Sequence, residues 1–146
     1  MSYKIYLSGE IHTQWREEIR QGATNLGLDV QFLAPVTDHD ASDAAGDLLG
    51  EELDNFWRDH KSSKVNLIRT KRQLEQADLV VIRFGDKYRQ WNAAFDAGYC
   101  TSLGKPYITL HSAELAHPLK EVNASALAWA QTTEQIVEIV KYVLQP

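Results

Sequence analysis

The sequence predicts a three-layer α/β fold, in which an open parallel sheet of four to five strands lies between two layers of helices. Short β-prone runs alternate with segments of helical apolar spacing along the 146 residues. Residues 79–82 are an uninterrupted apolar run, which is typical of a parallel strand buried on both faces. Because the chain contains no internal repeat or linker, we expect one domain over residues 1–146.

In the first half of the chain, residues 4–7 form a short apolar run that predicts the first strand. Residues 15–26 carry apolar or small side chains at helical spacing and predict a helix. Residues 30–33 predict the second strand. The acidic stretch that follows predicts a long loop with one helix around residues 43–57, and a further helix with a basic exposed face runs to about residue 76.

In the second half, the apolar run at residues 79–82 predicts a central strand, and a polar turn separates it from a helix at residues 92–103. Residues 107–110 predict the next strand and residues 127–129 a short fifth one. Residues 133–144 carry an apolar stripe and predict a closing amphipathic helix. This alternation indicates a flavodoxin-like or Rossmann-like arrangement.

The composition excludes several classes of protein. With 44% hydrophobic and 24% charged residues, the chain is typical of globular domains rather than of disordered or fibrous proteins. The single cysteine, Cys100, excludes an internal disulfide framework and an all-cysteine zinc site, and it favours a reducing compartment. No apolar stretch approaches the ~20 residues of a membrane span, and the first residues do not resemble a signal peptide. We therefore expect a cytoplasmic protein without a membrane partner.

The negative charge is concentrated in one segment. The chain carries a formal net charge of −5, which disfavours nucleic acid as a partner. Residues 34–60 contain eight acidic side chains and one basic side chain, Arg58, for a net charge of −7. The remainder of the chain therefore carries +2, so the charge describes this segment rather than the whole molecule.

Open parallel sheets bind ligands beyond the carboxyl ends of their strands, which directs attention to residues 8–10, 84–92 and 111–112. Neither a GxGxxG nor a GxxxxGK[ST] motif is present, which excludes the standard dinucleotide and P-loop sites. The first turn is either a phosphate-holding turn supported by Arg16 or a plain tight turn, since Glu10 would repel an anion.

The helix at residues 92–103 carries a carboxylate, Asp96, among apolar and small neighbours. Acidic side chains are seldom buried without a reason. Asn92, Tyr99 and Cys100 lie four, three and four residues from Asp96 and share its helix face. Asp96 is therefore either an acid held at a crevice or a side chain without a catalytic role that is exposed or bonds a neighbouring backbone group.

No residue pattern predicts a metal site. The five histidines lie far apart and show no HExxH spacing. Residues 38–40, Asp-His-Asp, are either a divalent-ion site or, by preference, a solvated acidic loop, and a metal-dependent hydrolase that uses the acidic stretch remains a third functional hypothesis. Cys100 has no base partner in the sequence, which favours inert packing.

Several ordered blocks of the sequence together resemble one family. The blocks are residues 5–9 (Ile-Tyr-Leu-Ser-Gly), 77–81 (Ala-Asp-Leu-Val-Val) and 92–106 (Asn-Ala-Ala-Phe-Asp-Ala-Gly-Tyr-Cys-Thr-Ser-Leu-Gly-Lys-Pro). They resemble the nucleoside 2-deoxyribosyltransferase superfamily, and the whole chain is most similar to its YtoQ group. The resemblance implies the α/β fold and chemistry at the N-glycosidic bond of a nucleoside or nucleotide.

In that superfamily a glutamate attacks the anomeric carbon, and its position falls on Asp96, which is one methylene shorter. The tyrosine that orients the nucleophile falls on Tyr6. Two acidic positions of the superfamily are occupied by neutral side chains, Gln90 and Thr70. Because an amide cannot protonate a leaving base at neutral pH, that role must lie elsewhere.

The resemblance implies an N-glycosyl transferase or N-glycoside hydrolase with Asp96 and Tyr6 as catalytic residues and without a cofactor or metal. Asp86, with Glu10 behind it, is the candidate for the acid. The expected substrate-binding residues are Ser8, Gly9, Arg16, Asp86, Gln90 and Asn92. The implied assembly is a homodimer or higher homo-oligomer, in which a neighbour's C-terminal region, including Trp129, closes the pocket.

Two questions stay open at this point. The acidic segment at residues 34–60, which lies near the pocket mouth in the superfamily, is either a lid that selects against anionic substrates or a solvated insert. The alternative to an enzyme is a non-catalytic nucleotide-binding or regulatory module on the same fold, which the neutral Gln90 and Thr70 favour and the retained Tyr6 and Asp96 oppose.

Overall fold

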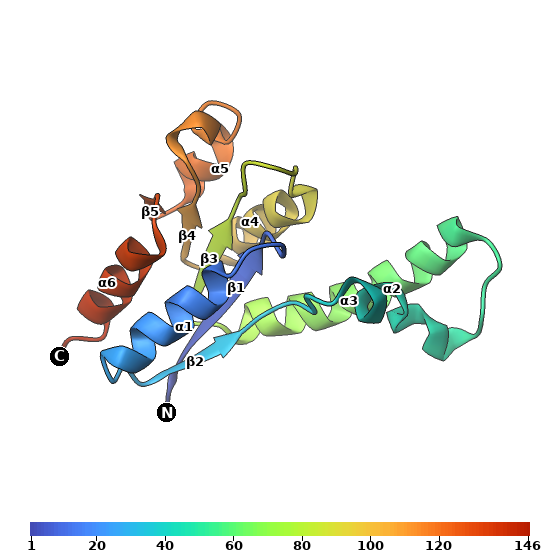
Figure 1. The fold of residues 1–146 in the computed structure, drawn as a ribbon, viewed down its shortest axis with the longest axis horizontal. Coiled ribbons are helices and arrows are strands. Elements are labelled where there is room, and N and C mark those ends of the chain that lie inside the picture. The colour runs from blue at the N-terminus through green and yellow to red at the C-terminus, as the bar shows by residue number, and fades with distance from the viewer.

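The sheet is parallel throughout in the computed structural model, which describes residues 1–146 (Figure 1). Strand β1 pairs with β3 from Ile5 opposite Leu79 to Gly9 opposite Arg83. The spatial order is β2-β1-β3-β4-β5. The strands are β1 (Tyr3–Gly9), β2 (Val30–Leu33), β3 (Leu79–Arg83), β4 (Tyr107–Leu110) and β5 (Ala128–Ala130). The predicted α/β class is confirmed, as are the five predicted strands.

Helices cover both faces of the sheet. One face packs against α1 (Trp15–Asn25) and α6 (Thr133–Val143), and the other packs against α4 (Trp91–Leu103) and the C-terminal part of α3 (Asn55–Gln76). The short helices η2 (Ala113–Leu115) and α5 (Lys120–Ser125) connect β4 to β5. The result is the three-layer arrangement that the alternation of strands and helices predicted.

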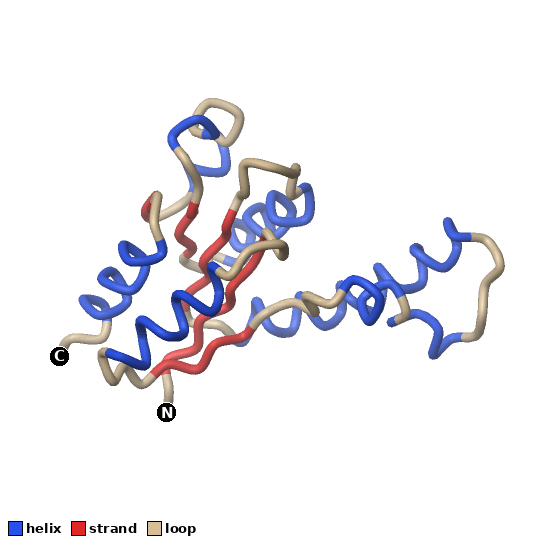
Figure 2. Tube along the Cα trace, in the orientation of Figure 1, coloured by secondary structure: helices blue, strands red, loops and turns tan.

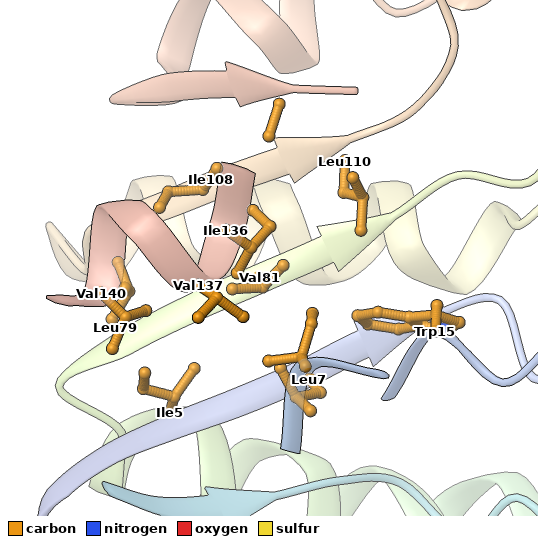
Figure 3. Packing of buried hydrophobic residues seen from close by; sticks show 12 residues of the cluster. Ile5, Leu7, Trp15, Leu79, Val81, Ile108, Leu110, Ile136, Val137 and Val140 are labelled. Atoms are coloured by element: carbon orange, nitrogen blue, oxygen red, sulfur yellow. The ribbon is translucent and has the colours of Figure 1, made fainter. Parts of the chain in front are cut away.

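The central strand β3 explains why its sequence lacks alternation. Leu79 and Val81 enter the hydrophobic cluster beneath α1 and α6, which Figure 3 shows from close by. Val80 and Ile82 enter the opposite cluster beneath α3 and α4. Each such side chain contributes about 1.5–3 kcal/mol when fully buried, so both faces must be apolar. The prediction of a strand buried on both faces is confirmed.

The acidic stretch differs from the prediction. The single helix expected around residues 43–57 is wrong, because the chain forms α2 (His39–Asp43), a 3₁₀ turn η1 (Ala45–Leu49) and then α3. Gly50 has a φ of 107°, which a continuous helix does not allow. Asp54 then caps α3, because its carboxylate accepts a hydrogen bond of 2.8 Å from the Phe56 N–H.

Residues 34–66 form an arm that projects from the body of the molecule (Figure 2). The first half of α3 extends past the sheet, and α2 and η1 pack along it. At 22 residues α3 is the longest helix, yet neither it nor another helix combines the length and apolar character needed to cross a membrane.

Gly9 is the glycine on which the junction of β1 and β3 depends. It ends β1 with a φ of 107°, and a Cβ at this position would lie 2.1 Å from the carbonyl oxygen of Arg83. We expect Gly9→Ala to lower the free energy of unfolding by at least about 3 kcal/mol, because the two strands would have to separate. Urea unfolding followed by circular dichroism measures this change.

Gly27→Ala is the matched control, because Gly27 also has a positive φ, 64°, but a Cβ added there would meet no other atom within 4 Å. Only the backbone cost of about 1–2 kcal/mol is expected there. Equal losses for the two variants would show that the contact with Arg83 does not constrain the junction.

Candidate functional site

A cavity of about 810 Å³ opens at the carboxyl ends of β1 and β3. Strand order changes direction at this point of the sheet, since β1 adjoins β2 on one side and β3 on the other. The walls come from the loop after β1, the start of α4, the middle of α3 and the base of the arm. Of the residues predicted for the site, those in the lining are Tyr6, Gly9, Gln90, Asn92 and Asp96.

Asp96 lies on the face of α4 that packs against β1, and only 8% of it is exposed. Ser8, which is fully buried near the end of β1, donates a hydrogen bond of 2.6 Å from its Oγ to Oδ2 of Asp96. Burial raises the pKa of Asp96 to about 6, and the hydrogen bond from Ser8 opposes the rise. Oδ1 accepts no hydrogen bond from the protein, so it is free to meet a ligand.

Tyr6 and Thr70 lie beside this carboxylate. Burial of Tyr6 and, second, the nearby charge of Asp96 raise the pKa of the tyrosine to about 12, while a hydrogen bond with Thr70 opposes the rise. The tyrosine therefore remains a neutral hydroxyl at physiological pH. Thr70 also lines the cavity, so this neutral side chain shares the cavity with Tyr6 and Asp96, which the family resemblance linked to catalysis.

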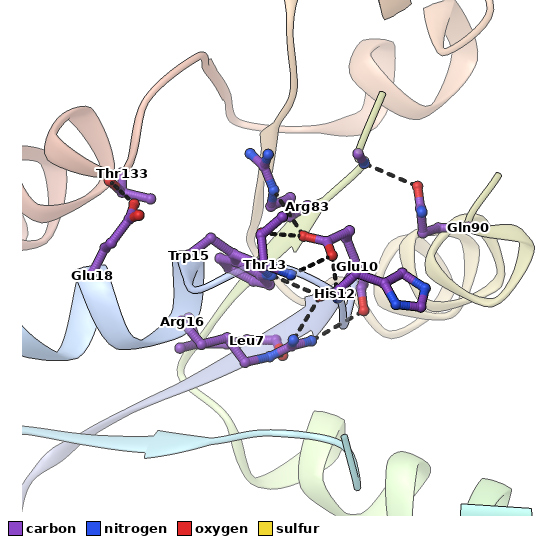
Figure 4. Close-up of polar contacts among 12 residues, drawn as sticks. Leu7, Glu10, His12, Thr13, Trp15, Arg16, Glu18, Arg83, Gln90 and Thr133 are labelled. Atoms are coloured by element: carbon purple, nitrogen blue, oxygen red, sulfur yellow. Dashed lines mark hydrogen bonds and ion pairs between the residues drawn. The ribbon is translucent and has the colours of Figure 1, made fainter. Parts of the chain in front are cut away.

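Glu10 lines the same cavity, but its carboxylate is occupied by hydrogen bonds that include several from the loop after β1 (Figure 4). Its carboxylate accepts hydrogen bonds from the backbone N–H of His12, from the N–H and hydroxyl of Thr13, and from Nε of Arg83 at 3.3 Å. Burial acts to raise the pKa of Glu10, but these hydrogen bonds outweigh it and the net shift is downward. Glu10 is therefore ionised at neutral pH and is a poor proton donor.

Gln90 has a fixed orientation at the start of α4. Its Oε1 accepts a hydrogen bond of 2.9 Å from the N–H of Gly85, which follows β3 (Figure 4). Because the carbonyl oxygen is occupied in this way, the Nε2 amide group is left to donate to a ligand. Asn92 is exposed two residues later and adds a second neutral amide to the lining.

Arg16 does not reach the cavity. Its guanidinium is buried, and it donates hydrogen bonds to three carbonyl oxygens at the end of β1, those of Leu7, Gly9 and Glu10 at 3.0, 3.1 and 2.6 Å. Burial lowers its pKa to about 10, so it still carries its charge at neutral pH. The structure thus uses Arg16 to hold the turn after β1.

The residues that follow β4 form a separate polar cluster outside the cavity lining. Asp86 accepts a hydrogen bond of 2.6 Å from the Ser112 hydroxyl. His111 is fully buried and stacks on Trp129 with 4.9 Å between ring centroids. The indole of Trp129 also donates to the His111 carbonyl at 3.1 Å. This cluster therefore ties β4, β5 and the loop after β3 together.

Besides the rings of Trp91 and Phe95, the cavity lining contains a group of three neighbouring aromatic rings that sequence reasoning missed. His12 lies 5.5 Å from His39 and 4.7 Å from Tyr88, measured between ring centroids. His12 and Tyr88 follow the ends of β1 and β3, so the rule that ligands bind beyond strand ends was a signal for both. His39 comes from the arm, and only the folded position of the arm brings it here.

The structure shows the surroundings of the residues considered for metal binding and for thiol chemistry, Asp38 and Cys100. Asp38 caps α2 by accepting from the Ala41 N–H at 2.9 Å. No group of three or more His, Cys, Asp or Glu side chains is placed to hold a metal ion. Cys100 lies on α4 and is buried, and burial raises the pKa of its thiol to about 12. A neutral buried thiol is a packing group rather than a nucleophile.

Solved structures with related folds include proteins of different function. A 2-deoxyribosyltransferase from Bacillus psychrosaccharolyticus is 20% identical, with a TM-score of 0.53, and the match covers 92% of this chain and 90% of that one. A conserved protein from Enterococcus faecalis V583 is 17% identical, with a TM-score of 0.56 and coverage of 99% and 100%. A CheY-like response regulator receiver domain from Methanospirillum hungatei JF-1 is 14% identical, with a TM-score of 0.54 and coverage of 99% and 94%. These similarities concern the fold alone.

The sequence comparisons are more specific. An uncharacterized protein YtoQ from Bacillus subtilis (strain 168) is 38% identical over 146 residues, and the match covers 99% of each chain. The family model described as nucleoside 2-deoxyribosyltransferase YtoQ matches residues 6–144. Together with the cavity at the β1–β3 junction, these matches show that the chain belongs to the nucleoside 2-deoxyribosyltransferase YtoQ family.

Proposed function

We propose that this protein cleaves the N-glycosidic bond of a nucleoside or nucleotide, with Asp96 as the nucleophile. The observation that carries the proposal is the buried carboxylate of Asp96, which Ser8 holds at 2.6 Å beside a cavity at the β1–β3 junction. Ligands of such sheets bind at this point, and a buried acid with a raised pKa is typical of functional sites.

In the proposed reaction, Oδ1 of Asp96 attacks the anomeric carbon while the C–N bond breaks and its electron pair passes to the base nitrogen. Ser8 holds Oδ2 and so fixes the plane of the carboxylate. Tyr6 packs beside Asp96 and limits its movement. Transfer is completed when a second base attacks the glycosyl ester, and hydrolysis is completed when water does so.

The leaving base must gain a proton, and we assign the donor to His12. Gln90 is an amide, Glu10 is held ionised by its hydrogen bonds, and Asp86 is paired with Ser112 outside the cavity lining. His12 lines the cavity, and imidazole is the commonest general acid of enzymes. Its ring stacks with His39 and meets Tyr88 at a tilt, and these two contacts hold it at the cavity wall.

The amides of Gln90 and Asn92 support recognition of the base. The free Nε2 group of Gln90 donates hydrogen bonds, which suits a carbonyl oxygen or ring nitrogen of a base. The same neutral side chains, with Thr70, favour the second candidate function, a nucleotide-binding module without catalysis. Binding without turnover separates that function from the enzyme.

The first experiment incubates the protein with a panel of nucleosides, 2′-deoxynucleosides and 5′-monophosphates and follows base release by chromatography. We expect Asp96→Asn to lower the rate by about 100-fold or more, because the amide cannot attack the anomeric carbon. We expect kcat/KM of the wild type to fall as pH drops below about 6, because attack requires ionised Asp96.

Asp86→Asn is the control for this experiment, since it makes the same chemical change at a carboxylate outside the cavity lining. Base release by wild type and Asp96→Asn at equal rates would remove Asp96 from the mechanism. Release by neither, together with measurable nucleotide binding, would establish the non-catalytic module instead.

The role of His12 is tested with a change of leaving group. We expect His12→Asn to slow release of an ordinary purine base by about 100-fold, because the departing base is no longer protonated. A 7-methylguanine nucleoside carries a positive charge on its base and leaves as a neutral molecule, so its release should be unaffected. Equal loss with both substrates would mean that His12 positions the substrate rather than donating a proton.

A further inference from the structure

The arm at residues 34–66 has a defined structure without a hydrophobic core. Neither hydrophobic cluster of the protein contains a residue from this segment. Its two buried residues, Gly46 and Ser62, meet through a hydrogen bond of 2.9 Å from the glycine N–H to the serine hydroxyl. Polar contacts therefore stabilise the arm along its length, and its apolar side chains do not form a core within it.

Ion pairs fix the shape of the arm near its tip. Arg58 donates two hydrogen bonds to the Asp47 carboxylate, at 3.3 and 3.2 Å. Lys61 pairs with Glu52 at 2.6 Å and also contacts the carbonyl oxygens of residues 49 and 50. These contacts join η1 and the following loop to α3, so the tip is presented as one surface.

The tip of the arm is an apolar surface that the protein leaves uncovered. Within residues 48–57, five large apolar side chains are each more than half exposed. They are Leu48, Leu49, Leu53, Phe56 and Trp57. Clusters of exposed apolar side chains of this kind mark interaction sites, whereas isolated ones do not.

A second exposed apolar surface overlaps the wall of the cavity, because two of its three residues also line the cavity. Trp91 and Phe95 are one turn apart on α4, and Ile68 lies on α3; all three are more than half exposed. The chain segments that carry the two surfaces have net charges of opposite sign. Residues 34–60 of the arm carry a net charge of −7, whereas residues 67–92, which follow the arm, contain six basic and three acidic side chains, a net of +3.

We infer that the tip of the arm docks on a second copy of this chain, over the surface formed by Trp91, Phe95 and Ile68. One chain carries both surfaces, so a two-fold axis satisfies both contacts at once, with each copy giving its tip and receiving its partner's. The opposite charges of residues 34–60 and 67–92 favour this pairing over a contact between like surfaces.

Charge also argues against other occupants of the tip. An anionic lipid surface or a nucleic acid would meet the −7 segment with repulsion. The family resemblance predicts self-association through the C-terminal region, whereas this inference concerns the arm and does not depend on the proposed reaction.

Light scattering of the full-length chain after size exclusion, across a wide range of concentrations, tests the inference. The wild type should have twice the 16.6 kDa mass of one chain. The double variant Leu53→Asp with Trp57→Asp should be monomeric, with an unchanged circular dichroism spectrum because both side chains are exposed. Leu127→Asp, a matched change at an exposed leucine of the body, should remain dimeric.

Cross-linking identifies the surface that receives the tip. Carbodiimide joins carboxylates to lysines in contact, and a mixture of isotope-labelled and unlabelled chains distinguishes links between copies. We expect mixed-isotope links between residues 34–60 and the lysines of residues 67–92, which are Lys71 and Lys87. A monomeric wild type, a dimer that survives the double variant, or links between copies that avoid these two segments would each overturn the inference.

Discussion

The hydrogen bond between Ser8 and Asp96 is the contact on which the site depends. It joins the end of β1 to the middle of α4, two elements separated by 88 positions in the chain. The carboxylate is held where α4 packs closely on the sheet, because the neighbours of Asp96 on this helix include Ala93 and Ala97, which are small and buried. A larger side chain at either position would lift the helix and separate the two partners.

Holding this carboxylate has a cost in stability. The pKa of Asp96 rises from 3.8 to about 6 on folding, so the folded protein binds the proton more tightly than the unfolded chain. The free energy of unfolding therefore falls as pH rises from about 4 to about 6, by a total of about 3 kcal/mol, and stays lower above that range. A buried carboxylate that lowers the stability of the folded protein, as Asp96 does at neutral pH, is typical of functional sites.

Sequence patterns predicted what depends on local periodicity. The uninterrupted run Leu79 to Ile82 predicted the central strand, and the small residues around Asp96 predicted a helix close to the sheet, while the sequence left open whether Asp96 was held at a crevice. The arm was predicted with the wrong helix, because Gly50 and the cap at Asp54 act through backbone conformation rather than through apolar spacing. His39 could not be placed from the sequence, since its contact with His12 depends on how the whole arm folds back.

The fold is shared with a 2-deoxyribosyltransferase, but the cavity of this chain has its own set of residues. Gln90 and Thr70 remove two acidic positions, while four hydrogen bonds keep Glu10 ionised and prevent it from donating a proton. Asp96 is left as the buried acid with a raised pKa in this cavity. The environment of that one carboxylate therefore decides whether the site can act on a glycosidic bond.

Nuclear magnetic resonance titration of the Asp96 side-chain carboxyl carbon tests this claim most directly. Aspartate labelled at that carbon gives one signal per residue, and the signal absent from Asp96→Asn identifies the group. The account predicts a pKa of about 6 and a further rise in Ser8→Ala, because the serine hydroxyl stabilises the ionised form. A pKa near 4, the usual value for an exposed aspartate, would contradict it.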